Sequence, residues 1–118
     1  MKIKCLLLIL FASYSTAGFA AFSETENNQL TSINQKSSGE VKSALDNLNK
    51  SIDEQIDNNM ERKPLILDLK NSWGQMINKK CQLETIESKG TDAEMAEMNN
   101  CLIKNYQEEM KYFDAMLP

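Results

Sequence analysis

Apolar residues recur at steps of three and four along most of this 118-residue chain, and they scarcely ever alternate with polar ones. That spacing is typical of amphipathic helices, each of which buries one apolar stripe. Four glycines and two prolines are few turn residues for a sheet protein, which needs them between its strands. The sequence therefore predicts an all-α protein, a small bundle or hairpin of about three amphipathic helices.

The first predicted helix runs for about four turns from residue 41, with Asp, Asn, Lys and Gln on its polar face. Residues 57–63 (DNNMERK) interrupt its apolar stripe, and Pro64 follows. Proline suits the first turn of a second helix, where its missing N–H has no cost, whereas a proline kink in one longer helix is the alternative. The stripe consists of Val41, Leu45, Leu48, Ile52 and Ile56.

The second predicted helix spans residues 65–88. Trp73 is the only tryptophan and has the largest apolar surface available, so we expect it to lie against the other helices. Lys89 and Gly90 end the helix with a cation in its last turn and a glycine where left-handed backbone is needed. Its broad apolar side contains Ile66, Leu69, Trp73, Met76, Ile77 and Leu83.

The third predicted helix begins directly after Gly90. Thr91 as N-cap and Glu94 three residues later have the spacing of a capping box. Steps of three and four then continue to the end of the chain. The apolar positions are Met95, Met98, Leu102, Tyr106, Met110, Phe113 and Leu117.

The N-terminus has the features of a secretory signal peptide. Lys2 and Lys4 precede the apolar run 5–12 (CLLLILFA), and small residues lead to Ala20. A membrane-spanning helix needs about 20 apolar residues, far more than this run provides. A bacterial lipid anchor needs a cysteine at the cleavage point, and Cys5 lies well upstream of it. We predict cleavage after Ala20 and a periplasmic or secreted protein with no stable membrane anchor.

Cleavage would leave 98 residues in two parts. Residues 21–40 form a polar lead-in, either a frayed helix or disordered, with Leu30 and Ile33 as its only possible anchors. Residues 41–118 form one helical domain. Loss of Lys2 and Lys4 leaves 11 basic and 17 acidic residues, a net charge of −6. That charge argues against nucleic acid as a binding partner and favours a cationic one, although a net charge also keeps ordinary proteins soluble.

Two cysteines remain after the predicted cleavage, at matched distances from the turn. Cys81 lies nine residues before Gly90, and Cys101 lies ten residues after Thr91. At ~1.5 Å per residue, both would lie roughly 14–15 Å from the turn on antiparallel helices. An even pair at matched height in an oxidising compartment predicts a disulfide. Zinc would need four ligands and this chain has no histidine, and a redox pair would show Cys-x-x-Cys spacing.

No catalytic motif is found in the sequence. Without histidine there is neither a Ser-His-acid triad nor a Cys-His pair, and the glycines stand isolated, so we predict a non-catalytic protein without cofactor or metal. The six methionines beyond residue 20 are interpreted mainly as core residues rather than an adaptable binding surface. The acids are placed on solvated faces; they include Glu24, Glu26, Asp53, Glu54, Asp57, Glu94, Glu97, Glu108 and Glu109.

The spacing of Trp73, Cys81 and the segment 96–102 (AEMNNCL) resembles the lysozyme inhibitor LprI N-terminal domain family, over roughly residues 41–113. The pair Leu48-Asn49 is similar to a Leu-Asn pair of that family. Residues 76–78 (MIN) replace a frequent Tyr-Arg-Asp run, and Glu109 stands where an Arg is common. The upstream cysteine pair of many members is missing here. The resemblance implies an exported, helical, non-catalytic domain, and for some relatives inhibition of lysozyme.

The leading functional hypothesis is an exported protein that binds or inhibits a cationic enzyme such as lysozyme. Acids near the predicted turn, Glu84, Glu87, Asp92 and Glu94, are the candidate partner-binding residues. Alternatives are an envelope assembly module that uses helix–helix contacts, and an immunity-like protein that neutralises a toxin. The sequence does not define an oligomeric state.

Overall fold

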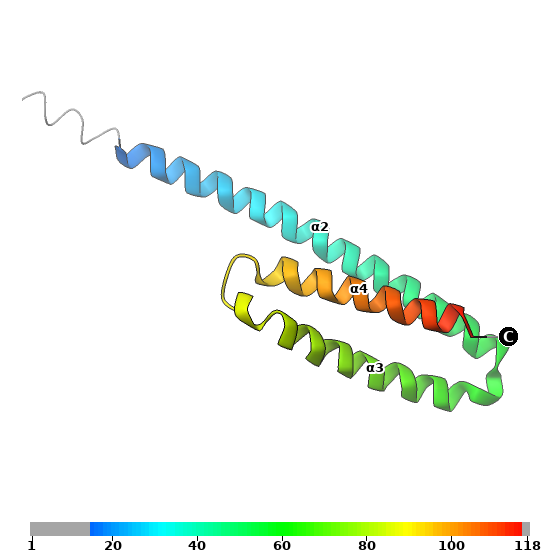
Figure 1. The fold of residues 1–118 in the computed structure, drawn as a ribbon. Coiled ribbons are helices and arrows are strands. Elements are labelled where there is room, and N and C mark those ends of the chain that lie inside the picture. Colours follow the sequence, from blue (N-terminus) through cyan, green and yellow to red (C-terminus); the bar gives the residue numbers. More distant parts are fainter. Residues whose placement is uncertain (1–14, 117–118) are drawn as a thin grey trace, which may run out of the picture. The chain divides into compact units, whose positions relative to one another are not determined.

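A computed structural model describes residues 15–116, with side chains from residue 24 onward, and every regular element in that part is helical. Helix α2 spans Ser15–Asn58, α3 spans Lys63–Glu84 and α4 spans Glu94–Asp114 (Figure 1). Two short 3-10 turns, η1 at Met60–Arg62 and η2 at Ile86–Ser88, lie in the two connections. The predicted all-α class with three helices is confirmed. Most of the predicted signal peptide, residues 1–14, lies outside the described residues, as does Leu117.

The chain divides into two compact units, Met1–Ile33 and Asn34–Pro118, and α2 contributes to both. The described part of the first unit is the helical segment 15–33, in which Leu30 is half-buried and Ile33 is exposed. The polar stretch 23–40 is helical throughout, so the helix expected from Val41 begins further upstream. The second unit contains the remainder of α2 together with α3 and α4.

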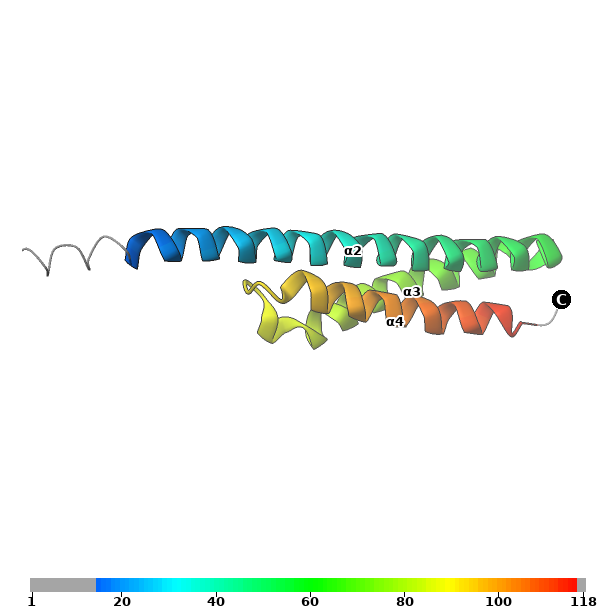
Figure 2. The same ribbon diagram turned by 90° about the horizontal axis from the view of Figure 1, so that it is seen from above.

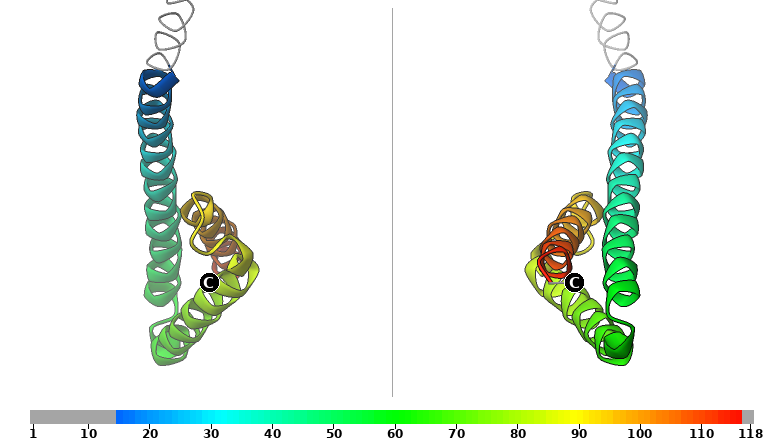
Figure 3. Two further views of the ribbon diagram at one scale, coloured as in Figure 1. Left: turned by 90° about the vertical axis from the view of Figure 1, so that its left-hand side faces the viewer. Right: turned by 90° about the vertical axis from the view of Figure 1, so that its right-hand side faces the viewer.

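The core of the second unit is made by all three helices. In Figures 1 and 2, α3 and α4 are antiparallel neighbours, and both lie along the part of α2 that belongs to this unit. Figure 3 shows the same arrangement turned by 90° about the vertical axis, again with α3 and α4 on one side of this part of α2. Half-buried side chains, among them Leu69, Tyr106 and Met110, surround the cluster. Its fully buried members are Leu48, Ile52, Ile56, Ile66 and Phe113.

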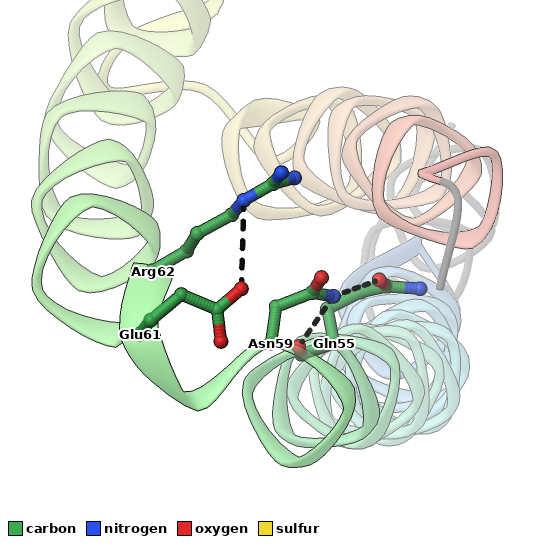
Figure 4. A network of polar contacts seen from close by, with 4 residues as sticks. All are labelled: Gln55, Asn59, Glu61 and Arg62. Atoms are coloured by element: carbon green, nitrogen blue, oxygen red, sulfur yellow. Dashed lines mark hydrogen bonds and ion pairs between the residues drawn. The ribbon is translucent and has the colours of Figure 1, made fainter.

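The turn from α2 to α3 is closed by side-chain amides. The Asn59 Nδ2 donates to the Gln55 carbonyl at 3.1 Å and to Gln55 Oε1 at 3.5 Å, which replaces backbone bonds lost at the end of α2 (Figure 4). Figure 4 also shows the exposed ion pair of Glu61 and Arg62, 3.8 Å apart, which contributes little to stability. Pro64 occupies the first turn of α3, as predicted, so the chain forms two helices rather than one kinked helix.

The single tryptophan joins α3 to α4. The Trp73 ring lies 5.3 Å from that of Tyr112, edge to face, and 6.2 Å from that of Phe113. Tyr112 and Phe113 are themselves edge to face at 5.3 Å. Such pairs contribute roughly 0.5–1.5 kcal/mol beyond the area that they bury. The expectation that Trp73 lies against another helix is confirmed.

The turn from α3 to α4 differs from the predicted one. α3 ends at Glu84, four residues before the predicted end, because the chain enters the 3-10 turn η2. Gly90 has the left-handed backbone expected of it, with φ of 80°. The Thr91 hydroxyl donates to the Ser88 carbonyl at 2.6 Å, and the Gly90 N–H donates to the Glu94 carboxylate at 2.9 Å. The predicted Thr91 cap is wrong, because α4 begins only at Glu94. The side chains of Thr91 and Glu94 stabilise the turn instead.

Several apolar residues assigned to the core are exposed instead. Met76 and Leu83 of α3 and Met95 of α4 are about half or more exposed. The reason is that α3 carries apolar residues on two sides, and only the side with Ile66, Ile77 and Cys81 is buried. Periodicity finds both sides but does not say which one is covered.

Two glycines provide a matched test of the turn. Gly90→Ala is expected to destabilise the fold by about 1 kcal/mol, because a Cβ disfavours left-handed backbone. Gly74→Ala is expected to stabilise it by about 0.5–1 kcal/mol, because Gly74 is within α3 and its backbone gains helix propensity. Neither added Cβ would meet another atom within 4 Å. Urea denaturation of both variants measures the effects; a change of the same sign in both would contradict the assigned turn.

Candidate functional site

A disulfide fixes α3 against α4 close to the turn that joins them. Cys81 and Cys101 are bonded, with their Cα atoms 5.7 Å apart, so the pairing predicted from their matched heights is confirmed. Cys81 is fully buried, and Cys101 is half-buried. The bond closes a loop over a sequence separation of 20, which includes η2, Gly90 and the first two turns of α4. The bond therefore holds the two arms of this hairpin together near its turn.

A polar layer surrounds the disulfide. Asn105 Nδ2 donates to the Cys101 carbonyl at 2.8 Å, and Lys80 Nζ donates to Asn105 Oδ1 at 3.0 Å. On the other side, the Thr85 hydroxyl donates to the Cys81 carbonyl at 2.7 Å. Asn105 and Thr85 are buried, and each buried amide or hydroxyl needs such a partner to offset its lost hydration. These bonds orient the last turn of α3 and hence the residues beyond it.

One turn further along α4, a carboxyl group lies inside the protein. Glu109 is 1% exposed, and its Oε1 has no hydrogen-bond partner. Burial raises the pKa of Glu109 from 4.5 to about 7, although the nearby Lys70 opposes that shift. The pKa of Tyr106 is raised by its own burial and by the negative charge of Glu109. The prediction that Glu109 lies on a solvated face is wrong.

Sequence reasoning missed Glu109 because most acids of the described part are solvated, as predicted, with Glu94 half-buried. The exposed acids include Asp53, Glu54, Asp57 and Glu108, as predicted. The missed signal is register: Asn105, Glu109 and Phe113 follow each other at steps of four, so they share one face of α4. Asn105 and Phe113 are buried, so Glu109 between them lies on the core face of α4.

The hairpin end, defined here as residues 82–100, combines negative charge with exposed apolar side chains. Five acids and one lysine give it a net charge of −4. Leu83 is 71% exposed and Ile86 is 60% exposed. Beside them lies an open hollow of about 660 Å³ whose lining includes Lys79, Gln82, Leu83, Ile86, Glu94 and Met98.

The four acids predicted to bind a partner all lie at this hairpin end. Glu84, Glu87 and Asp92 are exposed, whereas Glu94 is half-buried and accepts the Gly90 N–H. A fifth acid, Glu97, accepts a hydrogen bond from the Ser88 hydroxyl across the turn. Glu94 and Glu97 thus hold the turn, while the other three present carboxylates to solvent. The disulfide joins the two helices on either side of the segment that carries these acids. That they bind a partner stays a prediction.

The hairpin end presents exposed apolar side chains next to exposed carboxylates. The described residues contain no group of three or more His, Cys, Asp or Glu side chains placed to hold a metal ion. Among the described helices, none has the combination of length and apolar character that a membrane span requires. Apolar side chains exposed beside charges are typical of protein-binding surfaces. Comparisons with family models, curated proteins and solved structures find no match to this chain.

Proposed function

We propose that this chain is an exported, non-catalytic binding protein of the kind that the LprI resemblance implies, and that its hairpin end binds a cationic protein. Lysozyme is the first partner to test. The observation that carries the proposal is the exposed group of Leu83 and Ile86 beside Glu84 and Glu87. The apolar side chains supply area to bury, and the carboxylates attract a basic partner.

The charge distribution supports a local site rather than general solubility. After the predicted cleavage the net charge is −6, and the hairpin end alone carries −4. Concentrated charge of one sign accelerates the encounter with an oppositely charged protein. The disulfide supports binding in a second way, because a surface that is already rigid loses less conformational entropy when a partner docks.

The test is lysis of a cell-wall suspension by lysozyme in the presence of the purified exported chain. We expect the lysis rate to fall with micromolar protein, and calorimetry at low salt to detect the complex. The triple variant Glu84→Gln, Glu87→Gln, Asp92→Asn is expected to weaken binding by roughly tenfold or more, because three exposed carboxylates are removed from the contact surface.

A matched control variant has the same net charge as this triple variant but loses its acids elsewhere. The variant Asp53→Asn, Glu54→Gln, Asp57→Asn removes three exposed acids from α2 instead, and it should bind like the unmodified chain. Equal losses in the two triple variants would show that net charge, and not the hairpin end, controls binding. An unchanged lysis rate together with no binding heat would remove the lysozyme hypothesis.

A second candidate function is an envelope assembly module. The observation that favours it is the exposed apolar side of α3, which reaches from Leu65 to Leu83, well beyond the hairpin end. Its exposed apolar members are Leu65, Met76 and Leu83, and exposed apolar surface is where other proteins bind. An immunity-like protein that neutralises a cationic toxin would use the same acidic surface as the lysozyme hypothesis, so a basic toxin is the next partner to test.

A further inference from the structure

The outer face of α3 carries a row of residues that no part of its own unit covers. Leu65 and Leu83 are each 71% exposed, and Met76 is 51% exposed. Ser72 lies between Leu65 and Met76 and is also exposed. From Leu65 to Leu83 the steps are seven, four and seven, so Leu65, Ser72, Met76 and Leu83 lie on one side of α3. We call these four residues the outer row.

The outer row is distinct from the core side of α3. The core side carries Ile66, Ile77 and Cys81, which are buried. At about 100° per residue, the two sides lie roughly 120° apart around the helix. The helix therefore has a second, exposed side, and the charges beside that side indicate what binds it.

The outer row is symmetric about its own midpoint. Leu65 lies nine residues before Gly74, and Leu83 lies nine residues after it. If two copies of α3 are placed antiparallel around that level, Leu65 of each copy lies opposite Leu83 of the other. A two-fold contact has this property, since every residue pair occurs twice.

The charges beside the row fit the same arrangement. Asp68 and Lys79 are eleven residues apart, about three turns, so they lie on the same flank of the row. They are six and five residues from Gly74, respectively, on opposite sides of it. In the antiparallel pair, Asp68 of each copy therefore faces Lys79 of the other at almost the same height. Both side chains are exposed.

The surface is also hollowed where a leucine would enter. The hollow of about 660 Å³ at the end of α3 is lined in part by Lys79, Gln82, Leu83 and Ile86. Lys79, Gln82 and Leu83 belong to α3, Ile86 belongs to η2, and Glu94 and Met98 of α4 complete the lining. In the antiparallel arrangement, the side chain that comes to this level is Leu65 of the second copy.

We propose that the outer row of α3 binds the same row of a second copy of this chain, antiparallel, around a two-fold axis at the level of Gly74. Two Leu65–Leu83 contacts form the apolar ends of this interface, and two Asp68–Lys79 ion pairs fix its register. This pairing rests on the assembly function and names its partner, a second copy of the chain. It would cover Leu83, which the cationic partner would also contact, whereas Leu65 and Asp68 are at the other end of α3 and test the pairing alone.

Analytical ultracentrifugation of the exported chain over micromolar to millimolar concentrations tests the pairing. We expect a monomer–dimer equilibrium. Leu65→Gln should weaken the dimer by about a hundredfold, because two leucine contacts are lost per dimer. Ile33→Gln is the matched control: it replaces an exposed apolar residue of α2 and should leave the dimer constant unchanged.

A charge exchange tests the register. Asp68→Lys should weaken the dimer at least tenfold, because it places two like-charged pairs across the interface. The double variant Asp68→Lys, Lys79→Asp restores opposite charges in both pairs and should recover the original dimer constant to within about threefold. A monomer at every concentration, or a double variant no better than the single one, would overturn the proposal. All of these residues are exposed, so circular dichroism should show unchanged helix content.

Discussion

Reducing the Cys81–Cys101 disulfide is expected to lower the free energy of unfolding by about 3 kcal/mol, the chain-entropy value for a loop of this length. That is a large share of the roughly 5–15 kcal/mol that stabilises a small domain. The effect should be seen as a shift of the urea midpoint by about 1–3 M between oxidised and reduced protein, because m-values of small domains are about 1–3 kcal/mol/M.

The double variant Cys81→Ala, Cys101→Ala is the control for this experiment. It should unfold near the reduced midpoint and be insensitive to reductant. The hairpin end should also become mobile, so amide exchange should accelerate in residues 82–100 more than near Phe113. Equal midpoints for oxidised and reduced protein would show that the disulfide contributes no stability.

Much of the hairpin could be predicted from the sequence because each signal there is local. Gly90 has the left-handed backbone that its position after a helix predicts. The heights of Cys81 and Cys101 follow from counting residues along two helices from one turn. Pro64 marks the start of α3 because its ring permits only a few backbone positions. None of these inferences needs to know how the three helices are arranged.

The sides of the helices that face the core could not be predicted in the same way. Leu83 and Met76 are as apolar as Ile66 and Ile77, and both sets have helical spacing, yet only the second set is buried. The difference is tertiary, since α4 and the C-terminal part of α2 cover only one side of α3. The outer row of α3, which the sequence assigns in part to the core, is therefore a candidate interface in the structure.

Glu109 shows the same limit for a charged residue. Composition and local charge pattern place it with Glu108 and Lys111 on a solvated face. In the structure it lies on the core side of α4, between the levels of Asn105 and Phe113, both of which are buried. The local rule that acids are solvated fails because the register of α4 on its neighbours, set by Phe113 and the disulfide, decides which side is covered.

The buried carboxyl of Glu109 makes the stability of the fold depend on pH. Its pKa is about 7 in the folded protein and near 4.5 when the chain is unfolded, so folding favours the protonated form. With respect to this group, stability is therefore highest below pH 4.5, falls as pH rises from 4.5 to 7, and is constant above pH 7. At ~1.4 kcal/mol per pKa unit, the loss amounts to about 3 kcal/mol.

Glu109→Gln is therefore expected to stabilise the protein by up to about 3 kcal/mol at pH 8 and to change little at pH 4, because glutamine keeps the shape and loses the charge. Urea midpoints of both proteins from pH 4 to pH 8 measure the difference, which isolates this group from the many surface acids. Glu108→Gln is the control, since Glu108 is the exposed neighbour on the same helix and should give no such divergence. Parallel stability curves for Glu109→Gln and the unmodified chain would mean that the carboxylate reaches water in solution, and the packing of α4 against α2 and α3 would then have to be looser than described.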